Sequence, residues 1–294
     1  MARGSGIIGL AQWLKTPPGR YLLEWEQRHL DTAVADIFGF HALQLGWPEL
    51  DALRANRMPH RWIGVERSVP DDEAPAADAV VAVPEAEPAA TRPGAEPRPR
   101  PAIALLCDFD ALPFDANSLD LVVLPHALEL ARDPHLALRE VERVLVPEGR
   151  VVIVGFNPAS LWGLRQRLGE LRRGVDGGAA RPLFVSDAGD FLGYRRLRDW
   201  LKLLSFEIEA GRFGCYRPPV AAETWLQRYA WIESVGERWW PVFGAVYFVV
   251  AVKRVRGMRL VGMARKPQAV RNAAPAPAVA VHHHDKGGGR KPGA

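Results

Sequence analysis

Short apolar runs recur along the chain, and stretches with helical spacing of apolar residues separate several of them. The runs lie at residues 41–46, 61–68, 102–108, 119–125 and 150–156, and two more begin at residues 206 and 244. Runs that are apolar at consecutive positions are typical of strands buried on both faces of a parallel sheet. The alternation therefore predicts an α/β domain, with a doubly wound, mostly parallel, seven-stranded sheet and helices on both faces.

The clearest predicted helix begins at Asp133, a favourable N-cap residue, with Pro134 in the first turn. Apolar residues follow at helical spacing up to Leu145, and Pro147 then ends the helix just before the fifth apolar run. Residues 194–204 predict a further amphipathic helix.

The N-terminal residues 12–38 predict one or two helices with a break near residues 16–19, where Pro and Gly interrupt the pattern. The apolar side chains that we expect to pack on the sheet or over the site are Trp13, Leu22, Leu23 and Trp25.

Two segments, residues 70–101 and 265–294, are rich in Ala, Pro and Gly and hold neither a helical nor a strand period. We predict that both are disordered. The chain then divides into an N-terminal helical segment (1–39), one domain (40–264) interrupted by the insertion, and a basic tail.

The net charge of +4 is unevenly distributed. Residues 253–294 carry a net +9, which leaves a net −5 for the rest of the chain. The basic isoelectric point therefore gives no support to a nucleic-acid-binding core, although the tail could contact RNA or an anionic surface weakly.

Cysteine content and hydropathy bound the class of protein further. Two cysteines, Cys107 and Cys215, exclude a disulfide framework and a multi-cysteine zinc site. The apolar run at residues 244–252 is too short to span a bilayer, and the N-terminus lacks a signal-peptide cleavage site. We expect a soluble, cytoplasmic protein with no transmembrane segment.

The most informative stretch begins with the sequence CDFDALPF at residues 107–114 and ends with RVVIVGF at residues 150–156. Between them lie SLDLVV and LREVERVLVPEG, in the same order and spacing as in one known family. The stretch resembles the class I S-adenosylmethionine-dependent methyltransferases, in particular the type 11-like subgroup. The resemblance covers roughly residues 40–254 and implies a Rossmann-like fold and S-adenosylmethionine as cofactor.

The resemblance implies a cofactor site at successive strand ends, where open parallel sheets bind ligands. Gly46 corresponds to the first glycine of the family's glycine-rich loop, and Glu66 to the acidic residue that binds the ribose. Asp108 corresponds to the acceptor for the adenine amino group, and Phe109 follows it where the adenine ring is covered. Taken singly, Gly46, Glu66 and Asp108 also fit a strand-end turn, a solvated charge and a loop carboxylate.

The glycine-rich loop departs from the family pattern. Gln44 stands where the family has an acidic residue, and Pro48 and Leu50 stand where it has glycines. Pro48 removes a backbone N–H, and the side chain of Leu50 restricts close approach of a ligand to the backbone. A second hypothesis is therefore a non-catalytic methyltransferase-like module that binds a partner protein.

His126 follows the fourth apolar run, where the substrate cleft is expected to open. Its near-neutral pKa suits a general base, with Glu129 one turn later to orient it. The alternative is a histidine that begins the next helix and bonds to the backbone.

Other catalytic patterns are missing from the sequence, including a phosphate-binding loop, a nucleophile elbow and an HExxH motif. The three histidines near the C-terminus form no preorganised site, so we expect no metal cofactor. The fourth run ends in VVLPHAL, without the Asp/Asn-Pro-Pro motif of enzymes that methylate the exocyclic amines of nucleobases. We therefore expect methyl transfer to a small-molecule acceptor, with an RNA-associated protein that uses its tail as a third possibility.

A basic, tryptophan-containing segment follows the fifth apolar run, where the resemblance implies an insertion that caps the substrate. Residues 161–175 form an amphipathic pattern rich in Arg, in which we expect Trp162 and Leu164 to pack inward. We also expect Trp239 and Trp240, before the last strand, to be packing residues.

Overall fold

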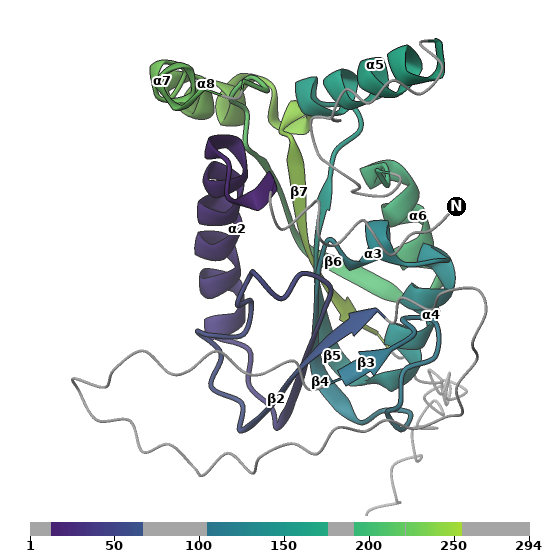
Figure 1. Cartoon of the computed structure of the whole chain (residues 1–294). Coiled ribbons are helices and arrows are strands. Elements are labelled where there is room, and N and C mark those ends of the chain that lie inside the picture. The colour runs from purple at the N-terminus through teal and green to yellow at the C-terminus, as the bar shows by residue number, and fades with distance from the viewer. Residues whose placement is uncertain (1–12, 67–104, 176–190, 221, 255–294) are drawn as a thin grey trace, which may run out of the picture. The chain divides into compact units, whose positions relative to one another are not determined.

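The computed structural model describes residues 13–66, 105–175, 191–220 and 222–254 (Figure 1). By its contacts the chain divides into residues 1–256 and 257–294, and every described residue belongs to the first unit. The predicted insertion and the predicted tail lie outside the described residues.

Seven strands form one sheet in the order β3-β2-β1-β4-β5-β7-β6. Their bounds are β1 (His41–Leu45), β2 (His60–Glu66), β3 (Leu105–Cys107), β4 (Leu119–Pro125), β5 (Leu145–Phe156), β6 (Phe206–Gly214) and β7 (Val246–Lys253). The first five strands pair in parallel, and β7 pairs antiparallel with both β5 and β6. The predicted doubly wound, mostly parallel, seven-stranded sheet is confirmed.

Helices cover both faces of this sheet (Figure 1). Their bounds are α2 (Pro17–Ala35), α3 (Ala127–Leu130), α4 (Pro134–Val144), α5 (Leu161–Val175), α6 (Tyr194–Leu203), α7 (Glu223–Arg228), α8 (Trp231–Trp239) and the 3-10 helix η2 (Pro241–Phe243). One buried cluster joins α2 to one face, and a second joins α4 and α6 to the other. Among the described residues, no helix has the length and apolar character needed to cross a bilayer.

The helix start at Asp133 is confirmed, because its carboxylate accepts hydrogen bonds from the N–H groups of His135 and Leu136. The predicted end at Pro147 is wrong. The helix stops at Val144, and Leu145 already has extended dihedral angles, pairs with the start of β4, and offers its carbonyl to the Lys253 ammonium at 2.9 Å.

Helix α2 begins at Pro17, within the predicted break at residues 16–19, and packs closely on the sheet. Leu22, Trp25 and Leu30 are buried, as is Trp13 before the helix. The ring of Trp25 lies so close to Gly214, at the end of β6, that a Cβ atom built on this glycine would come within 2.0 Å of it. Gly214 therefore sets how near α2 can come to the sheet.

Two expectations about apolar packing are wrong. Trp162 is buried as predicted, but Leu164 is 53% exposed. Trp239 and Trp240 are 70% and 56% exposed, because they lie at the end of α8 and on the turn into η2, where no described residue covers them.

We predict that Gly214→Ala lowers the free energy of unfolding by about 1–3 kcal/mol, because the methyl group would overlap the Trp25 ring. Gly211→Ala, three residues earlier in β6, is the matched control. Its added Cβ would have the Tyr194 hydroxyl as nearest neighbour, at 3.6 Å, so we expect a change within about 0.5 kcal/mol. Urea denaturation followed by circular dichroism measures both, and equal effects would show that α2 does not depend on this approach.

Candidate functional site

Three of the predicted cofactor residues follow neighbouring strands at one edge of the sheet. Gly46 follows β1, Glu66 ends β2 and Asp108 follows β3, and these strands lie side by side in the order β3-β2-β1. Glu66 lies in register with Cys107, the residue before Asp108. The structure thus brings the carboxyl ends of the three strands together, where open α/β sheets bind ligands.

Gly46 occupies a position that only glycine adopts easily. Its φ is +113°, and a Cβ atom there would lie 2.4 Å from the carbonyl oxygen of Pro125 at the end of β4. The next residue, Trp47, donates its N–H to the same carbonyl at 3.3 Å. The bare backbone of Gly46 therefore lets the ends of β1 and β4 approach each other.

The loop after Gly46 is organised by the buried side chain of Gln44. Its amide nitrogen donates to the carbonyls of Trp47 (2.9 Å) and Leu50 (2.6 Å), and its amide oxygen accepts from the N–H of Ala52 (2.9 Å). An ionised carboxylate at this position would have no hydrogen to donate to either carbonyl. The amide of Gln44, which both donates and accepts, is thus matched to the conformation of this loop.

The acidic residues at the ends of β2 and β3 form a half-buried, negatively charged group. A carboxylate oxygen of Glu66 accepts the backbone N–H of Arg132 at 3.2 Å. Partial burial raises the pKa of Glu66, and the negative charges of Asp108 and Asp110 raise it further. Phe109 is buried in the core beneath them.

His126 lies at the end of β4 in a left-handed conformation (φ 56°) and is fully buried. Its Nδ1 lies 2.7 Å from Glu129 Oε2, and its Nε2 lies 2.8 Å from Glu26 Oε1 on α2. The ring stacks on Trp47 with centroids 3.9 Å apart. Glu129 also accepts the backbone N–H of Phe156 at the end of β5. One imidazole therefore joins α2, β4 and the altered loop.

The electrostatics of this cluster place a proton on each ring nitrogen at neutral pH. Burial alone lowers the pKa of His126, but the carboxylates of Glu26 and Glu129 outweigh it and raise the pKa to about 10. Burial raises the pKa of Glu26 as well. An imidazolium with both N–H groups engaged has no free lone pair. The geometry therefore argues against the expected role of His126 as general base and favours a positioning role.

Glu26 is the site residue that sequence reasoning missed. It is fully buried on the face of α2 that also buries Leu22, Trp25 and Leu30. The sequence contained one signal for it: the helical period places the carboxylate of Glu26 on the apolar face of the helix, where a charged residue is unusual.

Two buried polar atoms of this cluster have no hydrogen-bond partner: Glu26 Oε2 and Trp47 Nε1. Buried acceptors and donors are paired in most proteins, so unpaired ones next to a ligand-binding edge are candidates for ligand contacts. Among the described residues there is no cluster of His, Cys, Asp or Glu that could hold a metal ion.

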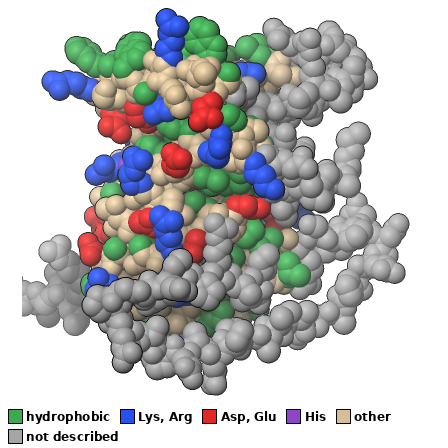
Figure 2. All heavy atoms as spheres, turned by 60° about the vertical axis from the view of Figure 1, so that its left-hand side comes forward, with side chains coloured by type: hydrophobic (Ala, Val, Ile, Leu, Met, Phe, Trp, Pro, Cys, Tyr) green, Lys and Arg blue, Asp and Glu red, His purple; other side chains and the backbone are tan. Residues whose placement is uncertain are grey.

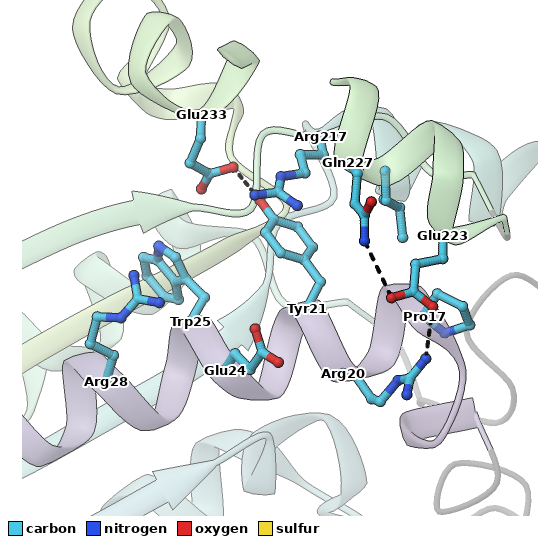
Figure 3. A pocket seen from close by; sticks show the side chains of 11 residues that line it. Pro17, Arg20, Tyr21, Glu24, Trp25, Arg28, Arg217, Glu223, Gln227 and Glu233 are labelled. Atoms are coloured by element: carbon cyan, nitrogen blue, oxygen red, sulfur yellow. Dashed lines mark hydrogen bonds and ion pairs between the residues drawn. The ribbon is translucent and has the colours of Figure 1, made fainter. Parts of the chain in front are cut away.

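A groove of about 350 Å³ lies on the outer side of α2, against α7 and α8. Figure 3 shows Tyr21 pointing from α2 toward Glu233, to which its hydroxyl donates a hydrogen bond. The guanidinium of Arg217 lies over the Tyr21 ring at 4.3 Å, and Arg20 pairs with Glu223 at 3.2 Å. These pairs tie α2 to α7 and α8 and leave the groove without a concentrated charge.

The order β3-β2-β1-β4-β5-β7-β6, with β7 antiparallel, and the polar residues at the strand ends define a class I methyltransferase fold. A family model described as a methyltransferase domain matches residues 78–153, which include β3, β4 and most of β5. This segment of the chain is thus similar to the methyltransferase domain family.

Curated relatives match over short regions. The chain is 43% identical over 103 residues to the uncharacterized protein YafS of Escherichia coli, covering 35% of this chain and 39% of that protein. It is 43% identical over 68 residues to a malonyl-[acyl-carrier protein] O-methyltransferase of Halorhodospira halophila, covering 23% and 22%. The ubiquinone/menaquinone biosynthesis C-methyltransferase UbiE of Paraburkholderia xenovorans is 39% identical over 54 residues, covering 18% and 22%. The chain therefore spans well under half the length of these relatives.

Similar solved structures have low sequence identity. A putative methyltransferase from a complex with the Haloferax volcanii Trm112 activator is 16% identical, with a TM-score of 0.48 and coverage of 86% of this chain and 99% of that one. A possible histamine N-methyltransferase of Thermotoga maritima is 14% identical, with a TM-score of 0.47 and coverage of 80% and 90%.

The buried cluster predicts a defined pH dependence of stability. Because the folded-state pKa of His126 is raised from 6.5 to about 10, its contribution is complete below pH 6.5 and is lost as the pH rises toward 10. We expect His126→Gln to cost about 3–5 kcal/mol near pH 6, because two buried carboxylates lose their cation. Urea unfolding of both proteins from pH 6 to 10 should show the difference shrinking as the pH rises. A difference independent of pH would mean that His126 is neutral in the folded protein.

Proposed function

We propose that the protein transfers a methyl group from S-adenosylmethionine to a small-molecule acceptor. The observation that carries the proposal is the placement of Gly46, Glu66 and Asp108 at the carboxyl ends of three adjacent strands in a sheet of this order. Glu66 is suited to accept hydrogen bonds from the ribose hydroxyls. Asp108 is suited to accept a hydrogen bond from the adenine amino group, with the buried ring of Phe109 below the adenine.

The amino-acid end of the cofactor needs an acceptor for its ammonium and donors for its carboxylate. Glu26 Oε2 and Trp47 Nε1 are an unpaired acceptor and an unpaired donor in one cluster beside Gly46. We propose that they take the place of the backbone groups that Pro48 and Leu50 alter. When all its members are ionised, the cluster of two carboxylates and one imidazolium is net negative, which suits a cationic ligand.

S-adenosylmethionine, when bound, supplies a methyl group that is already activated for in-line displacement. The chain's own residues then need only to bind the cofactor, orient the acceptor and exclude water, which accounts for large rate effects without a base. In this proposal His126 orients Glu26 and Trp47 and is a positioning residue.

The alternative is a methyltransferase-like module that binds a partner without catalysis. Its support is that Trp47 and Leu50 are 3% and 1% exposed and fill space beside β1. The RNA-associated alternative depends on the tail, which lies outside the described residues.

We expect Asp108→Ala to weaken binding of S-adenosylhomocysteine by about 1–3 kcal/mol, the cost of a lost charge-assisted hydrogen bond. Asp115→Ala, in the exposed loop after β3, is the matched control and should leave the affinity unchanged. Isothermal titration calorimetry of the three proteins gives the affinities. If the folded wild-type protein does not bind at millimolar ligand, the non-catalytic alternative is the better-supported hypothesis. Equal affinities of the wild type and D108A would show that Asp108 does not contact the cofactor.

A further inference from the structure

Large apolar side chains are exposed at the end of the molecule formed by α5, α7, α8 and η2. Ten of the 15 exposed large hydrophobic residues among the described positions belong to these four helices or to the Trp240 turn between α8 and η2. Figure 2 shows hydrophobic side chains gathered at the top of the molecule. A concentration of this kind marks a binding surface rather than the scattered apolar residues of an ordinary surface.

Helix α5 contributes an exposed stripe of leucines. Leu161, Leu164, Leu168 and Leu171 are 56%, 53%, 46% and 67% exposed, and their spacing of three and four residues places them on one face. The opposite face is buried through Trp162. The helix is thus fixed to the domain by one face and presents an apolar face outward.

Arginines flank this leucine stripe. At 100° per residue, exposed Arg165 lies on one side of the stripe and exposed Arg167 on the other. Over its whole length α5 carries four Arg and one Glu. An apolar face bordered by cationic residues is typical of helices that lie in a membrane interface.

The second part of the surface is mostly aromatic. Its exposed members on α7, α8 and η2 and on the turn between the last two are Trp225, Trp231, Trp239, Trp240, Val242 and Phe243. Tryptophan is enriched at membrane–water interfaces, because its ring is apolar and its N–H can stay hydrated.

The leucine stripe and the aromatic part belong to the same end of the domain (Figure 1). The indole N–H of Trp162 on α5 donates to the carbonyl of Arg217 at 2.8 Å, in the segment that leads to α7. The side-chain amide of Asn157, just before α5, donates to the carbonyl of Val242 in η2 at 2.8 Å.

We propose that this apolar cap, defined as the α5 leucine stripe together with the exposed aromatic residues of α7, α8 and η2, docks on the surface of an anionic lipid bilayer. The arginines flanking the stripe complement anionic headgroups. The proposed contact is with the bilayer surface, and no described helix is long and apolar enough to cross the bilayer. This proposal does not depend on the proposed methyl-transfer activity.

Docking would also orient the candidate site. The cap lies at the carboxyl end of β5, which leads into α5, and His126 lies at the carboxyl end of the neighbouring strand β4. A membrane at the cap would thus lie at the end of the sheet where the sequence predicts that the substrate cleft opens.

The test is flotation of the full chain with vesicles of phosphatidylcholine alone and of phosphatidylcholine mixed with phosphatidylglycerol, at low salt and at about 1 M salt, where the Debye length is about 3 Å. We expect binding to the mixed vesicles that is reduced but not abolished at high salt, because buried leucine and tryptophan side chains are not screened. The variant Leu164→Gln/Leu168→Gln should lower the partition coefficient at least about tenfold.

The control variant is Leu136→Gln/Leu203→Gln, which changes two leucines on α4 and α6 that are 41% and 75% exposed. It should bind within about twofold of wild type, and both variants should keep the wild-type melting temperature, since only exposed positions change. Failure of the wild type to bind vesicles, equal losses in both variants, or complete release at high salt would each overturn the proposal. Light scattering that shows a dimer abolished by L164Q/L168Q would assign the cap to a second copy of the chain instead.

Discussion

The candidate site depends on one buried ionic contact, in which the imidazolium of His126 lies between the carboxylates of Glu26 and Glu129. Removing one partner of such a contact typically costs about 3–5 kcal/mol, because the remaining charges stay buried without compensation. The contact joins helix α2 to the end of β4, and through the backbone N–H of Phe156 it also reaches the end of β5. The N-terminal helix therefore contributes a side chain, Glu26, to the candidate site.

The loop after β1 follows from the same contact. Trp47 stacks on the His126 ring, and Gln44 holds the carbonyls of Trp47 and Leu50. Residues 46–52 thus form a loop with its own hydrogen bonds and burial. The site has two different halves: a buried half at β1 and β4, and a half-buried acidic half at β2 and β3, where Glu66 and Asp108 lie.

The strands could be predicted because parallel strands buried on both faces are apolar at consecutive positions. The family resemblance assigned Gly46, Glu66 and Asp108 to strand ends, and the ends of adjoining parallel strands lie at one edge of a sheet. Glu26 could not, because its contact with His126 joins positions 100 residues apart. Leu164 and Trp239 were predicted as packed for a related reason: an amphipathic pattern shows that a segment has an apolar face, but not that anything covers it.

The protonation state of His126 can be observed directly by nitrogen-15 NMR of the histidine side chains, with His126→Gln to assign the signal. We expect both ring nitrogens of His126 to carry protons at pH 7.5 and to lose the first one only near pH 10. A neutral ring at pH 7.5, titrating near its ordinary pKa of 6.5, would contradict the buried imidazolium and return His126 to the role of a candidate general base.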